Sequence, residues 1–132
     1  MFTIRATGGV ALFLAGTTWL WLTPELASRS VDTTGALWAA TRVLGLVTLL
    51  GFSAATWGLF ARHPWWEGVT LGSALVGLLT LVPYAVAASR GGESAGAWTW
   101  NVLVHVVMVA GVLVLLLVPT LERWVSRHVT GT

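Results

Sequence analysis

The chain has 132 residues, of which 56% are hydrophobic and only 9% are charged, and its formal net charge is +2. Soluble domains carry about 25% charged residues, and a small domain has much surface to cover with polar groups. The composition therefore argues against a soluble enzyme, a nucleic-acid-binding domain and a disordered chain, and it predicts an integral membrane protein.

Four apolar blocks are long enough to cross the hydrocarbon layer, which takes about 20 residues of helix. They cover residues 6–22, 37–60, 66–88 and 98–121, and the charged residues fall between them or at their edges. Only a helix or a closed barrel satisfies its backbone hydrogen bonds in lipid, and the connections here are short. We therefore expect an all-α fold, with residues 1–132 forming one antiparallel four-helix bundle of four transmembrane helices.

The first block, residues 6–22, also allows a second interpretation, a cleaved signal peptide. Arg5 precedes the block, and the small residues Ala27 and Ser28 follow it. Glu25, however, would occupy a position before the cleavage site where a small residue is preferred, and the apolar stretch is long. We therefore favour a retained first span.

The second block, residues 37–60, carries a strip of small side chains at helical spacing. Small residues let helix backbones approach closely in a membrane, so this strip predicts a packing surface. Its members are Thr41, Gly45, Thr48, Gly51, Ala55 and Gly58.

The third block, residues 66–88, has a comparable face formed by Ser73, Gly77, Thr80 and Tyr84. Pro83 lies beside this face and lacks the N–H that would bond to the carbonyl four residues earlier. A kink there would open a polar cavity lined by the hydroxyls. The alternative, which we favour, is a close contact with another helix.

The fourth block, residues 98–121, contains Asn101 and His105 one helical turn apart, a spacing that predicts a hydrogen bond between the amide and the imidazole. His105 is the only titratable side chain well inside a predicted span. One interpretation is a proton-responsive or ligand-contacting group. The other, which we favour, is a neutral histidine bonded to a neighbouring helix.

All nine tryptophans lie near the end of a predicted span. Indole rings are amphipathic and favour the headgroup level, so this distribution predicts a tryptophan-rich interface at both membrane surfaces. The residues are Trp19, Trp21, Trp38, Trp57, Trp65, Trp66, Trp98, Trp100 and Trp124.

Orientation depends on a small excess of positive charge at one end of the predicted bundle. With the N-terminus inside, four arginines face the cytoplasm (Arg5, Arg62, Arg123 and Arg127) and three face outward (Arg29, Arg42 and Arg90). The positive-inside rule then predicts both termini in the cytoplasm. In size and span number the chain resembles small four-span proteins of bacteria and archaea, which implies the plasma membrane of a prokaryote.

Several chemistries lack the residues they require. The chain has no cysteine, which removes disulfides, cysteine–zinc sites and iron–sulfur clusters. Its five acidic residues lie outside the spans or at their edges, and no nucleophile, base and orienting group stand in a recognisable pattern. We expect no enzymatic activity, no cofactor and no metal ion.

Two classes of function remain. The first is a structural or accessory subunit of a membrane assembly, whose partners are the lipid bilayer and either further copies of the chain or another membrane subunit, with no nucleic acid. The second is a small oligomeric channel, transporter or lipophilic-ligand-binding protein that uses a polar face of the third and fourth spans. The candidate ligand-binding or pore-lining residues are His105, Asn101, Tyr84, Thr80 and Ser73.

Overall fold

The computed structural model describes residues 3–22, 34–92 and 95–130. Within these ranges every regular element is helical, which confirms the predicted all-α class for the described part of the chain. The elements are α1 (Ile4–Thr17), the 3-10 helix η1 (Thr18–Leu22), α2 (Ala36–Phe60), α3 (Trp66–Arg90), α4 (Ala95–Leu117), α5 (Pro119–Val125) and the single π-helical segment η2 (Ser126–Thr130).

Three of these helices, α2, α3 and α4, are long and apolar enough to cross a membrane. Helices α2 and α3 coincide closely with the second and third predicted blocks, whereas α4 begins and ends earlier than the fourth block. The first block instead forms α1, which has 14 residues, followed directly by the five residues of η1. The crossing of a membrane by this first segment stays a prediction.

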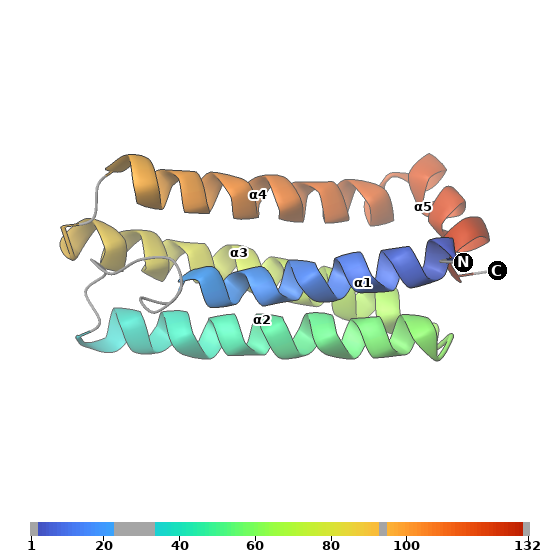
Figure 1. The fold of residues 1–132 in the computed structure, drawn as a ribbon, viewed down its shortest axis with the longest axis horizontal. Coiled ribbons are helices and arrows are strands. Elements are labelled where there is room, and N and C mark those ends of the chain that lie inside the picture. Colours follow the sequence, from blue (N-terminus) through green and yellow to red (C-terminus); the bar gives the residue numbers. More distant parts are fainter. Residues whose placement is uncertain (1–2, 23–33, 93–94, 131–132) are drawn as a thin grey trace.

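The helices lie side by side and alternate in direction along the chain (Figure 1). The two termini and the turn between α2 and α3 lie at the same end of the molecule (Figure 1). The most extensive packing is between α2 and α3, followed by α1 on α2 and α3 on α4. By contrast, α1 and α4 pack little against each other.

Glycines allow the close approach of the central helices. A Cβ atom added at Gly51 of α2 would collide with the side chain of Ser73 on α3, and one added at Gly16 of α1 would lie 2.6 Å from Cβ of Phe52. Small residues at a helix contact let the backbones approach until such side chains fit. The small strip of α2 and the polar face of α3 are therefore contact surfaces.

Seven hydroxyl groups on α2 and α3 donate to the backbone carbonyl four residues earlier in the same helix, at 2.7–2.9 Å. This bond satisfies the donor without any partner from another helix. The polar strips thus do not require water or a ligand to be accommodated. The residues are Thr41, Thr48, Ser53, Thr56, Thr70, Ser73 and Thr80.

The C-terminal segment differs from the predicted helix over residues 98–121. Helix α4 ends at Leu117, Val118 is extended (φ −79°, ψ 117°), and Pro119 begins α5. A proline disfavours the helical conformation in the residue before it and suits the first position of a new helix. The chain then turns back toward the start of α1, where Arg5 Nε donates to the Val129 carbonyl at 2.8 Å.

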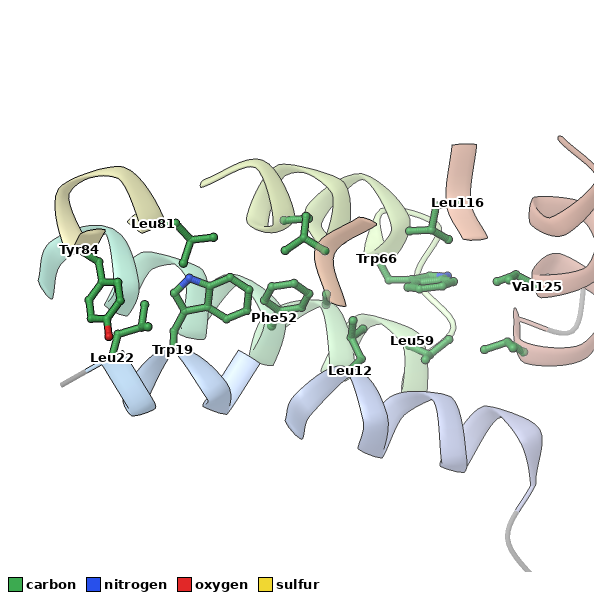
Figure 2. Packing of buried hydrophobic residues seen from close by; sticks show 14 of the residues in the cluster. Leu12, Trp19, Leu22, Phe52, Leu59, Trp66, Leu81, Tyr84, Leu116 and Val125 are labelled. Carbon is green, nitrogen blue, oxygen red and sulfur yellow. The ribbon is translucent and has the colours of Figure 1, made fainter. Parts of the chain in front are cut away.

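The tryptophans divide between surface and core. Trp57, Trp65, Trp100 and Trp124 are exposed near helix ends, as an interface belt requires, whereas Trp19, Trp38 and Trp66 are buried. Figure 2 shows Trp19 beside Phe52 and Leu81, and Trp66 near Leu59 and Leu116. Interface placement therefore does not account for every tryptophan, because these three fill the core between the helices.

Candidate functional site

The predicted polar residues of the third and fourth spans form a short chain of contacts that connects three elements. The imidazole of His105 is fully buried. Its Nδ1 lies 2.7 Å from the Asn101 carbonyl oxygen, and its Nε2 lies 3.0 Å from the Thr18 carbonyl oxygen on η1. The Asn101 side-chain amide donates to the Tyr84 hydroxyl oxygen on α3 at 3.0 Å. This chain, Thr18–His105–Asn101–Tyr84, is called the polar link below.

One detail of the sequence prediction is wrong, because the Asn101 amide and the His105 imidazole do not bond to each other. Side chains on a helix lean toward its N-terminus, over the preceding turn. The imidazole therefore meets the backbone carbonyl of Asn101 rather than its side chain. The amide is left to reach across to α3, where it finds Tyr84.

Both ring nitrogens of His105 face carbonyl oxygens, which can only accept hydrogen bonds. A neutral imidazole carries one N–H and donates to one of them, whereas an imidazolium donates to both. With the proton on Nε2, the neutral imidazole donates to the Thr18 carbonyl and joins α4 to η1 across the bundle, as the imidazolium also does. In these forms the group is placed to hold the two elements together.

Trp19 is the residue that the sequence did not associate with this site. Its ring packs edge-on against the His105 ring, with centroids 4.9 Å apart and planes at 80°. It stacks on Phe52 at 5.7 Å, and its indole N–H donates to the Gly77 carbonyl at 3.3 Å. The position of Trp19 near a span end suggested a headgroup anchor, and no pattern in the sequence distinguished it from the exposed tryptophans.

Thr80 and Ser73 do not take part in the polar link. Both are buried, and their hydroxyls donate to Val76 and Val69 of their own helix. Helix α3 continues through Pro83 to Arg90, and both Thr80 and Tyr84 are fully buried. The polar cavity beside Pro83 stays an interpretation of the sequence.

A large apolar groove lies between α1 and α4, with a volume of about 890 Å³. One wall is α1 from Ile4 to Thr17 with Thr18 of η1, the other is α4 from Met108 to Leu116, and Leu59, Trp66 and Thr70 form its floor. Below, this feature is called the α1–α4 groove. The sequence did not predict it, because a groove wall and a lipid-facing surface have the same apolar composition.

A smaller cavity, of about 200 Å³, lies beside η1 and the start of α2. Its lining includes Trp19, Trp38 and Arg42. None of the five predicted site residues lines either this cavity or the α1–α4 groove.

Over the described ranges no group of three or more histidine, cysteine or acidic side chains is placed to hold a metal ion. Comparison with known proteins found no matching family model, no matching curated protein and no matching solved structure.

Proposed function

We propose that this chain is a four-span membrane protein of a prokaryotic plasma membrane and acts as a structural or accessory subunit of a membrane assembly. The observation that carries the proposal is the polar link. A channel or transporter would be expected to direct its intramembrane polar groups toward a hydrated path. Here the imidazole of His105 is buried, and its two nitrogens face backbone carbonyls and not a hydrated path.

The outer surface of the bundle supports membrane insertion. Exposed large apolar side chains cover all four long segments, a surface that suits hydrocarbon and not water. They include Val10, Phe13 and Leu14 on α1, Val43, Leu46 and Leu50 on α2, Leu75, Leu79 and Val82 on α3, and Leu103, Val107 and Val114 on α4.

The length of the first segment supports a fourth crossing. The 14 residues of α1 rise about 21 Å at 1.5 Å per residue. The five residues of η1 add about 10 Å at 2.0 Å per residue. The sum is close to the hydrocarbon thickness of about 30 Å. The α1–η1 segment also exposes the same kind of apolar surface as the three longer helices.

Single cysteines test the span number and the orientation, because the chain has no cysteine of its own. Thr3→Cys and Arg62→Cys each place a thiol at one end of the bundle, and Gly92→Cys places one at the opposite end. In intact cells we expect a membrane-impermeant maleimide to label only Gly92→Cys, and to label the other two only after permeabilisation. Opposite accessibility of Thr3→Cys and Arg62→Cys would contradict a fourth crossing, and a reversed pattern would contradict the orientation.

Two measurements test the accessory role: the mass of the complex that the chain forms, and the flux of solutes through vesicles that contain the chain. We expect the chain extracted from its own membranes in mild detergent to have the constant mass of a defined complex, either with copies of itself or with another membrane subunit. Vesicles containing the purified chain should leak ions and small solutes no faster than empty vesicles. A flux that wild type shows and His105→Ala lacks would contradict the proposal and favour the channel class.

A second candidate function, binding of a lipophilic ligand, is favoured by one observation, the α1–α4 groove. Its volume of about 890 Å³ falls within the usual range of small-molecule sites, about 300–1,000 Å³. This candidate uses a different surface from the polar face that the sequence indicated.

A further inference from the structure

We propose that the α1–α4 groove holds an acyl chain of an anionic phospholipid, whose headgroup lies at the end of the bundle where both termini meet. The inference rests on the proposed membrane location but not on the accessory role. Three features of the groove carry it: where it ends, what its floor is made of, and which charges lie at its mouth.

The groove stops part of the way across the bundle. At its inner end η1 and α4 are joined by the bond between His105 Nε2 and the Thr18 carbonyl, and the Thr18 hydroxyl lies 3.9 Å from Sδ of Met108. From Ile4 to Thr18 the α1 wall is about 21 Å long at 1.5 Å per residue. One leaflet of hydrocarbon is about 15 Å deep, half of the whole layer.

This length discriminates between an acyl chain and a helix. A partner helix that crosses the membrane would have to continue along the bundle past the level of Thr18, where the polar link closes the gap between η1 and α4. A helix is also about 10–12 Å wide with its side chains. A lipid chain from the nearer leaflet, about 15 Å deep, fits within the groove's length of about 21 Å and needs no passage beyond Thr18.

The floor of the groove is suited to a chain without polar atoms. Leu59 and Trp66 are buried beneath it, and the Thr70 hydroxyl there already donates to the Trp66 carbonyl. On the α4 wall, a Cβ atom added at Gly111 would meet nothing within 4 Å. The groove therefore has unfilled apolar space and offers few polar groups that would favour water.

The end of the bundle at which the groove opens carries an excess of positive charge. Trp124, Val125 and Val129 line the groove at this end, where Arg5 also lies. Cationic side chains near the membrane surface attract anionic headgroups. Among the described residues of the elements that meet at this end, the arginines are Arg5 in the first turn of α1, Arg62 in the turn after α2, Arg123 in α5 and Arg127 in η2, and the carboxylates are Glu67 in the first turn of α3 and Glu122 in α5.

The test uses the purified full chain in vesicles that contain a small fraction of phosphatidylglycerol with a photoreactive group near the end of one acyl chain. We expect labelling of the groove walls to exceed that by the matching phosphatidylcholine probe, by about fivefold for each arginine that contacts the headgroup. Labelling on the outer face of α3, around Leu79, should be the same for both probes, since this face meets bulk lipid.

Two variants fill the groove from opposite walls, Gly111→Phe on α4 and Ala11→Phe on α1. Each should reduce groove labelling several-fold. The matched control is Gly72→Phe, because Gly72 is also an exposed helical glycine with no atom within 4 Å of an added Cβ, but it lies outside the groove. Circular dichroism and gel filtration identify any variant that fails to fold. If one groove variant fails to fold, labelling of the other groove variant tests the inference.

Several outcomes overturn the inference. Unchanged groove labelling in a folded groove variant, or equal labelling of the groove by the two probes, contradicts an anionic lipid site. Oxidation of the single thiol in Gly111→Cys to a disulfide-linked dimer places a second copy in the groove instead. Absence of labelling along the whole chain contradicts membrane insertion itself, whereas labelling of outer faces alone contradicts only the lipid site.

Discussion

His105 illustrates how a polar side chain is accommodated among apolar helices. Its ring is fully buried, its two nitrogens face backbone carbonyls, and Trp19 covers its edge. Every contact comes from the protein, so the imidazole needs no water or ligand. The sequence identified the residue, because a histidine within an apolar block stands out, but its partner on η1 is 87 positions away along the chain and carries no side-chain signal.

We predict that His105→Phe destabilises the fold. Phenylalanine keeps a ring for Trp19 to pack against but donates no hydrogen bond, so the Thr18 carbonyl loses its link to α4. The free energy of unfolding in detergent, measured by titration with a denaturing detergent, should fall by about 1–2 kcal/mol.

The matched control for this prediction is His128→Phe. His128 is exposed, and phenylalanine retains the stacking of its ring on Trp124 and loses only the exposed contact of 2.9 Å between Nδ1 and the Trp124 carbonyl. Its effect on the free energy of unfolding should stay within about 0.5 kcal/mol. Equal stability of His105→Phe and the control would mean that the polar link does not hold the helices together.

At the scale of a helix, contact faces and lipid faces are distinguished by what surrounds their glycines. On α3, Gly77 lies against the Trp19 ring and the Thr48 methyl group, whereas Gly72, five positions earlier, has no atom within 4 Å of an added Cβ. The sequence placed Gly77 on the contact face from its spacing with Ser73, Thr80 and Tyr84. The sequence did not show that Trp19 fills this contact, because the position of Trp19 depends on how η1 packs and not on the spacing along α3.

We predict opposite effects for two alanine substitutions on α3. In Gly77→Ala the new methyl group collides with the Trp19 ring, which its stacking on Phe52 and its bond to the Gly77 carbonyl hold in place. Overpacking of this kind should lower the free energy of unfolding by about 1–3 kcal/mol. In Gly72→Ala only the better helix propensity of alanine acts, and it should raise the free energy of unfolding by as much as about 1 kcal/mol.

The same unfolding titration measures both glycine variants. Gly77→Ala should unfold at a lower denaturant concentration than wild type, and Gly72→Ala at the same or a higher one. If Gly77→Ala were as stable as Gly72→Ala, the contact between η1 and α3 would be looser than the structure has it.

Helix boundaries followed from the sequence except where local chemistry interrupts an apolar run. The extents of α2 and α3 match the predicted blocks closely, because charged residues and turns bound them. The end of α4 does not, because Pro119 sets the preceding residue in an extended conformation inside a stretch that remains apolar to Leu121. Hydropathy describes where a segment suits lipid, and it does not detect a backbone break within that segment.

At the scale of the whole molecule, the C-terminal segment closes one end of the bundle over α1. An added Cβ at Gly8 would lie 3.3 Å from Cγ1 of Val129, and Arg5 bonds to the Val129 carbonyl nearby. The sequence predicted that both termini lie at one end, from the even number of spans. It did not predict this contact, because η2 lies beyond the apolar blocks and binds through its backbone.

We predict that Gly8→Cys combined with Val129→Cys forms a disulfide on mild oxidation, since the side chains at these positions approach within bonding range. The cross-link closes most of the chain into a loop and should stabilise the fold by about 2–4 kcal/mol. A mobility shift on non-reducing gels and the unfolding titration measure the two effects.

The control pair is Gly8→Cys with Gly111→Cys, whose positions lie on opposite walls of the α1–α4 groove. This pair should remain reduced. Oxidation of both pairs to the same extent would mean that α1 and α4 close on each other, and the groove would then not persist in the membrane.

The hydroxyl bonds within α2 and α3 have a consequence for how the protein is made. These bonds lie within each helix, so under the proposed membrane insertion each helix can enter the bilayer without a partner for its hydroxyl groups. His105 differs, because its Nε2 finds its acceptor only on η1, near the beginning of the chain. The earliest segment must therefore stay within reach until α4 has been made, so this bond between η1 and α4 forms only after most of the chain has been synthesised.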